Sequence, residues 1–176
     1  MGQTERARAE RALDARVDDT ADEESIEWPA AVKRIAAARE RQGLSETDVA
    51  SRVGLTIPAY FDLEQFEDEV FTVIDLNQLS SLAAALGVKP AVLLLGDEAE
   101  PIPQDITPED AVAHLNEHLA TRRQSIEELE EAVGWFLAPV VADPTHLWTY
   151  PVEALYVICK AIGVDWVRAL PPLPVG

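Results

Sequence analysis

The chain has 176 residues, with 14 Lys and Arg against 32 Asp and Glu, a formal net charge of −18 and 48% hydrophobic residues. This apolar content supports a folded core, and the length suits one large domain or two small ones. A lone cysteine excludes a disulfide scaffold, and every apolar run is too short to cross a bilayer. We therefore expect a soluble, cytoplasmic protein whose charge disfavours nucleic acid and acidic membranes as partners.

Composition divides the chain into four segments. Residues 1–28 are rich in Arg, Ala, Asp and Glu with almost no large apolar side chain, which predicts a disordered or frayed arm. Residues 29–96 have helical apolar spacing and predict a helical module. Residues 97–110, "DEAEPIPQDITPED", contain three prolines and no base and predict an extended linker. Residues 111–176 predict a second helical module.

The first module is expected to contain five helices, each bounded by residues that favour helix ends. They cover residues 30–41, 45–53, a segment that begins near Thr56 with Pro58 in its first turn, 75–86 and 90–96. Ser45 is the expected N-cap of the second helix, and Asp48 completes an approximate capping box. Gly54 and Gly87 are placed to end the second and fourth helices.

The pattern of the first module recurs after the linker. Val133-Gly134 aligns with Val53-Gly54 at an offset of 80, and "AIGVDW" aligns with "ALGVKP" at an offset of 76. One shortening between the third and fourth helices accounts for the difference. Two all-helical modules of about 65 residues each explain these coincidences better than chance.

The segments "RERQGLSETDVASRVGLTIPAYFDLE" and "LSSLAAALGVKPAVLLLG" resemble the Cro/XRE family of helix-turn-helix repressors over residues 32–96. The resemblance implies an all-α fold of tandem five-helix, lambda-repressor-like modules, the second of them degenerate. It also implies a buried ion pair between Arg39 and Glu64. We assign that pair to fold integrity, because a buried charge without its partner costs about 3–5 kcal/mol.

The resemblance places the family's base-reading positions at Ile57, Pro58 and Asp62. None of these side chains is a good reader of a base edge, because readout needs donors and acceptors aimed into the groove. Acids also stand where the family contacts phosphates, and acids repel phosphates. We therefore expect an acidic, partner-binding face made of Glu46, Asp62, Glu67, Asp68 and Glu69.

The second module departs further from the family. Leu119 and Pro144 replace Arg39 and Glu64, and "FLAPVVADPTHLWTY" has no Lys or Arg and two prolines that shorten a helix. Two interpretations of the aromatic residues remain open. Trp135, Trp148, Tyr150 and Trp166 pack in the core and between modules, or Phe136, Trp148 and Tyr150 form an exposed hot spot for a partner.

Other motifs point to no enzyme and no cofactor. His114, Glu117 and His118 spell H-x-x-E-H, which resembles the inverted zinc-protease motif, but a third ligand is missing and two surface histidines are the favoured reading. Cys159 lies on an apolar helix face and is expected to be buried, not nucleophilic. A glycine-rich phosphate loop and a nucleophile elbow are both absent.

Two functions remain. The favoured one is a non-enzymatic regulator that binds a basic protein through the acidic face, as an antitoxin, an immunity protein or a DNA mimic does. The alternative is a DNA-binding transcriptional regulator of the XRE family, reading DNA as a dimer with bases such as Lys33, Arg34 and Arg52. A homodimer is an open possibility.

Overall fold

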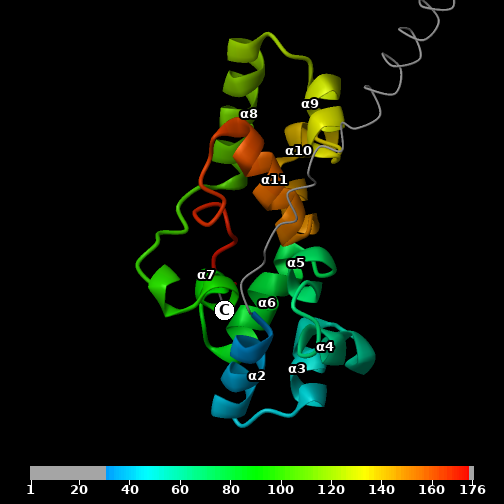
Figure 1. The fold of residues 1–176 in the computed structure, drawn as a ribbon, viewed down its shortest axis with the longest axis vertical. Coiled ribbons are helices and arrows are strands. Elements are labelled where there is room, and N and C mark those ends of the chain that lie inside the picture. Colours follow the sequence, from blue (N-terminus) through cyan, green and yellow to red (C-terminus); the bar gives the residue numbers. More distant parts are fainter. Residues whose placement is uncertain (1–30, 175–176) are drawn as a thin grey trace, which may run out of the picture.

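The computed structural model describes residues 31–174, and this part of the chain is mostly helical and contains no β-strand. Figure 1 shows two groups of helices stacked along the long axis, with α2–α7 at one end and α8–α11 at the other. The expected all-α class is confirmed. The predicted arm, residues 1–28, lies outside the described residues.

The first group contains one more helix than expected. Its helices are α2 (Ala31–Arg41), α3 (Glu46–Val53), α4 (Ile57–Leu63), α5 (Glu69–Thr72), α6 (Leu76–Leu86) and α7 (Pro90–Leu95). The unexpected helix is α5, a single turn without a side-chain N-cap. Val70 and Phe71 of α5 are completely buried, so tertiary packing, which has no local sequence signal, holds this turn in place.

The helix-end signals of α3 act as predicted. The Ser45 hydroxyl accepts a hydrogen bond from the Asp48 backbone N–H at 3.1 Å, and the Asp48 carboxylate accepts one from the Ser45 backbone N–H at 3.0 Å. Gly54 follows the helix with a φ of +76°, a left-handed conformation that costs least at glycine. These ends define the sharp turn between α3 and α4.

The connection between the two groups is more structured than an extended linker. It begins with the 3₁₀ turn η1 (Asp97–Ala99), and α8 (Pro108–Arg122) already starts inside the predicted linker. Thr107 caps α8 in a capping box with Asp110. The prediction for residues 97–110 is therefore wrong at both ends, because Ala99 is buried and Thr107-Pro108 favours a helix start.

The second group comprises α8, α9 (Ile126–Val133), α10 (Ala138–Ala142), the 3₁₀ helix η2 (Pro144–Thr149) and α11 (Val152–Ile162). The bounds of α9 equal those of α3 at an offset of 80, and the bounds of α11 equal those of α6 at an offset of 76. Where the first group has α4, the second has only the five-residue α10 and then η2. Pro139 and Pro144 lie in the first turns of these two short elements.

The two groups are joined where α6 and α11 begin. Asp75 and Pro151 form an isolated antiparallel bridge, and the Leu76 backbone N–H donates to the Tyr150 carbonyl at 2.9 Å. Asp75 precedes α6 as Pro151 precedes α11, so the bridge pairs equivalent positions. Pairing of equivalent positions is what a local two-fold relation produces. The C-terminal segment returns to the first group, where the Ser80 hydroxyl donates to the Pro172 carbonyl at 2.6 Å.

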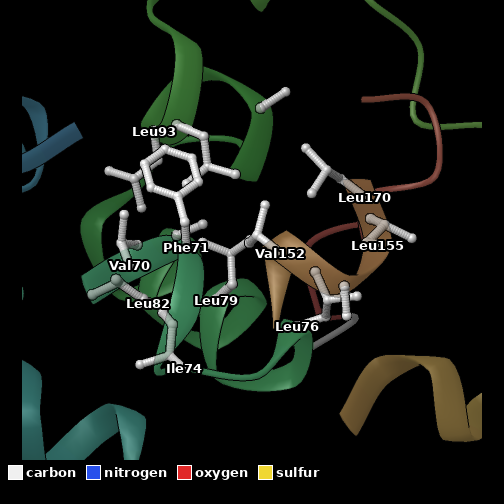
Figure 2. Packing of buried hydrophobic residues seen from close by; sticks show 14 of the residues in the cluster. Val70, Phe71, Ile74, Leu76, Leu79, Leu82, Leu93, Val152, Leu155 and Leu170 are labelled. Atoms are coloured by element: carbon white, nitrogen blue, oxygen red, sulfur yellow. The ribbon is translucent and has the colours of Figure 1, made fainter. Parts of the chain in front are cut away.

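A single apolar core runs through this junction. Figure 2 shows Val152, Leu155 and Leu170 of the second group facing Leu76, Leu79 and Phe71 of the first. Each of these side chains is at most 1% exposed. Neither group therefore buries its apolar surface alone.

Within residues 31–174, no helix has both the length and the apolarity needed to cross a membrane.

We expect Leu76→Ala to lower the free energy of unfolding by about 2–5 kcal/mol, because it opens a cavity at the junction. Far-ultraviolet circular dichroism and tryptophan fluorescence should give one coincident transition before and after the change. The control is Asn77→Ala at an exposed site of the same helix, which should stay within about 0.5 kcal/mol. Two separate transitions in the unaltered chain would contradict a shared core.

Candidate functional site

A buried ion pair joins α2 to the C-terminal end of α4. The Arg39 guanidinium donates from Nε to Glu64 Oε1 at 2.7 Å and from Nη2 to Glu64 Oε2 at 2.8 Å. The Tyr60 hydroxyl also donates to Glu64 Oε1, at 2.6 Å. The side chains of Arg39 and Glu64 are only 15% and 6% exposed. The expected pair is thus present, with a tyrosine that the sequence did not suggest as a third member.

The charges of this cluster stabilise one another. Burial by itself raises the pKa of Glu64, but hydrogen bonds from Arg39 and Tyr60 outweigh it and hold the pKa below its usual value. Burial and the bond to Glu64 raise the pKa of the Tyr60 hydroxyl, which therefore stays a proton donor at neutral pH. Arg39 also donates to the Leu44 carbonyl at 3.2 Å, before α3. The cluster thus ties α2 to both ends of the α3–α4 unit.

The five predicted acids of the partner-binding face do not all share one environment. Asp62 is half-buried on α4, Glu67 and Asp68 are exposed in the following turn, and Glu69 is half-buried at the start of α5. These four acids lie on or between α4 and α5, two helices that contact each other. Glu46 is set apart from them, because its Oε1 lies 3.9 Å from Arg39 Nη2.

The same segment exposes large apolar side chains. Ile57, Phe61, Phe66 and Val73 are 50%, 47%, 53% and 59% exposed. Ile57 and Phe61 are four residues apart and share one face of α4, while Tyr60 and Leu63 of the same helix are buried. In the sequence, the four-residue interval between Ile57 and Phe61 already indicates that the two side chains share one face of a helix.

We call this surface the α4–α5 face and define it by its exposed apolar side chains and its acids. It consists of Ile57, Phe61, Asp62, Phe66, Glu67, Asp68, Glu69 and Val73. Of the three positions expected by resemblance to read nucleotide bases, Ile57 and Pro58 are exposed and Asp62 is half-buried. The sequence contains no Lys or Arg between Arg52 and Lys89. The α4–α5 face is therefore apolar and acidic, and it contains no Lys or Arg.

The aromatic residues of the second group divide between the two interpretations. Phe136 is 76% exposed, and its backbone carbonyl accepts a hydrogen bond from the Tyr150 hydroxyl. Trp135, Trp148, Tyr150 and Trp166 are half-buried and pack against the core. The structure thus brings Tyr150 next to the backbone of Phe136. Of the three residues of the predicted hot spot, Phe136 alone is largely exposed. The ring centroids of Trp135 and Tyr150 lie 5.5 Å apart.

In the second group, the positions equivalent to Arg39 and Glu64 hold uncharged residues. Leu119 is half-buried against the core, and Pro144 begins η2. A different carboxylate supports the turn there, since Glu130 Oε1 accepts from the backbone N–H groups of Leu137 at 2.6 Å and Ala138 at 2.9 Å. The second group thus has no ion pair at these two positions, and its α9–α10 connection is held by hydrogen bonds from backbone N–H groups to Glu130.

The remaining candidates lie on α8 and α11. His114 and Glu117 are exposed and His118 is half-buried. No group of three or more His, Cys, Asp or Glu that could hold a metal ion occurs in the part of the chain described. Cys159 is 1% exposed, as expected for packing. Burial and the nearby Asp165 charge raise the pKa of its thiol to about 12.

We expect Arg39→Ala to lower the free energy of unfolding by about 3 kcal/mol or more, because it leaves the Glu64 carboxylate buried without a counter-charge. Chemical denaturation measures the change. Arg41→Ala is the matched control on the same helix, where the side chain is exposed. Equal stability of the two variants would show that the ion pair does not support the fold.

The Cys159 thiol should react slowly with a thiol reagent at pH 8 in the native protein, because only the thiolate attacks and its pKa is about 12. Denaturant should restore reaction at the rate of an ordinary cysteine. The reagent's absorbance follows the reaction, and Cys159→Ser gives the blank. Fast labelling of the native protein would contradict the buried position.

Comparison with known proteins adds no relative. No family model, curated protein or solved structure matches this chain. Functional conclusions therefore depend on its own residues and their arrangement.

Proposed function

We propose that this protein is a non-enzymatic regulator that binds a basic protein through the α4–α5 face, on a scaffold of tandem Cro/XRE-like modules. One observation carries the proposal. The helix that corresponds by resemblance to a recognition helix, α4, exposes Ile57 and Phe61 and leads into Glu67 and Asp68, with no base from residue 53 to residue 88.

Charge favours a protein partner over DNA at this face. Lys and Arg contacts to phosphates supply most non-specific affinity for DNA through release of counterions. Acids in the same places repel the phosphates, at about 1 kcal/mol for a contact of 4 Å through water. A basic protein surface is instead attracted and its association accelerated.

Apolar exposure supports the same partner class. Phe61 and Phe66 are large rings that lose solvent on docking, and buried aromatic anchors carry much of the energy of protein interfaces. Acids at the edge of such anchors mainly determine orientation and partner choice. The expected partner surface therefore combines Lys or Arg with apolar side chains that fit between the two phenylalanines.

The bases considered for DNA binding lie elsewhere in the first group. The Arg34 guanidinium donates to the Leu93 and Leu94 carbonyls of α7, at 2.9 Å for Leu93, so it is committed within the fold. Lys33 is on the same helix, α2, whereas only Arg52 lies on α3. The α4–α5 face therefore has none of these basic side chains to contact the phosphates of a DNA duplex.

The test places a photo-crosslinking residue at Phe61 in the full chain in cells and identifies the captured species by mass spectrometry. We expect a basic protein. The triple change Glu67→Lys, Asp68→Lys and Glu69→Lys should reduce the crosslink by at least about tenfold, because attraction becomes repulsion. The control Glu40→Lys, Glu117→Lys and Glu131→Lys changes the net charge equally at exposed sites and should keep the crosslink.

Two outcomes would overturn the proposal. One is equal crosslinking by the triple variant and its control, which would make the acids a solubilising surface only. The other is binding of the unaltered chain to random duplex DNA with a steep loss as salt rises, which would restore the DNA-binding alternative.

A further inference from the structure

A cavity of about 370 Å³ lies in the first group, between α2 and α7. Its aliphatic lining includes Ala38 and Leu93, each 1% exposed, and the half-buried Val88 and Val92. Pockets that hold small molecules are concave, mostly apolar and have volumes of about 300–1,000 Å³. The cavity therefore has the volume and the apolar lining of a site for a small ligand.

The edge of this cavity is positively charged, against the charge of the whole chain. Lys33, Arg34 and Arg41 all line it, which is half of the six bases in residues 32–96. Lys33 and Arg41 are exposed, and neither forms an ion pair among residues 31–174. In a protein with a net charge of −18, unpaired cations collected at one hollow attract an anion.

The geometry of α2 arranges these cations around an apolar centre. Lys33, Ala37 and Arg41 follow one another at four-residue intervals, so they share one face of the helix over about 12 Å. Arg34 is held beside them by its bonds to the Leu93 and Leu94 carbonyls at the end of α7. Within residues 31–174, Lys33 and Arg41 thus have no ion-pair partner.

The lining also limits the charge of the ligand. Asp97 is the acid that lines the cavity, and it offsets one of the three cations and repels a highly charged anion. A carboxylate carries a single charge and matches the planar fork of Arg41 with two parallel hydrogen bonds. Because the apolar lining is aliphatic, the body of the ligand should be aliphatic as well.

We propose that the cavity between α2 and α7 binds a small aliphatic carboxylate, with the acid group on Arg41 or Lys33 and the chain against Ala38, Val92 and Leu93. The site is separate from the α4–α5 face, because α4 and α7 lie on opposite sides of the first group in Figure 1. It does not depend on the function proposed for that face.

The test titrates the ¹⁵N-labelled full chain with sodium octanoate and follows backbone amide shifts by nuclear magnetic resonance. Saturable shifts should be confined to α2, α7 and Gly96. 1-Octanol, which has the same number of carbon atoms but no charge, should bind at least about tenfold more weakly, because it lacks the charge-assisted hydrogen bonds.

Two variants separate the charge from the cavity. Lys33→Glu with Arg41→Glu should weaken octanoate binding by at least about tenfold, whereas Arg52→Glu with Arg122→Glu changes the net charge equally at exposed, distant sites and should leave it unchanged. Ala37→Phe fills the cavity at an exposed position without changing any charge and should abolish binding. Shifts spread over the whole surface, no saturable shifts, equal binding of octanol, or equal loss in both charge variants would overturn the proposal.

Discussion

The structure depends on the contact between the beginnings of α6 and α11. Each helical group is small, and a domain of that size buries a smaller fraction of its surface than a large domain does and is only marginally stable by itself. Leu76 and Leu79 of one group and Val152 and Leu155 of the other remove one another from water at this contact. The backbone bond between Leu76 and Tyr150 aligns the two helix starts. Stability is therefore a property of both groups together.

Within the first group, the ion pair of Arg39 and Glu64 holds the end of α4 against α2. The pair and the Tyr60 hydroxyl hold one side of the helix against the interior. Ile57 and Phe61 consequently face outward, although both are apolar. Contiguous exposed apolar patches often mark a contact surface. The same buried charges that support the fold thus support the proposed binding face.

The net charge is distributed unevenly between two surfaces. Acids accumulate from Asp62 to Glu69, in a stretch of the sequence that lacks bases, while Lys33, Arg34 and Arg41 surround the cavity beside α7. Opposite local potentials on one small molecule attract ligands of opposite sign to different places. The proposed basic protein and the proposed small carboxylate would therefore contact different residues.

By itself, the sequence determined the helical class, the capping of α3 by Ser45, the repeat offsets and the partnership of Arg39 with Glu64. The helical class, the cap and the repeat offsets depend on the spacing of residues along the chain, whereas the ion pair was expected from the resemblance to the Cro/XRE family. Only the tertiary structure revealed the extra helix α5, the early start of α8, the bond of Tyr60 to Glu64, the exposure of Phe66 and the cavity between α2 and α7. Each of these depends on which distant segments remove a side chain from water, and local periodicity does not encode that choice.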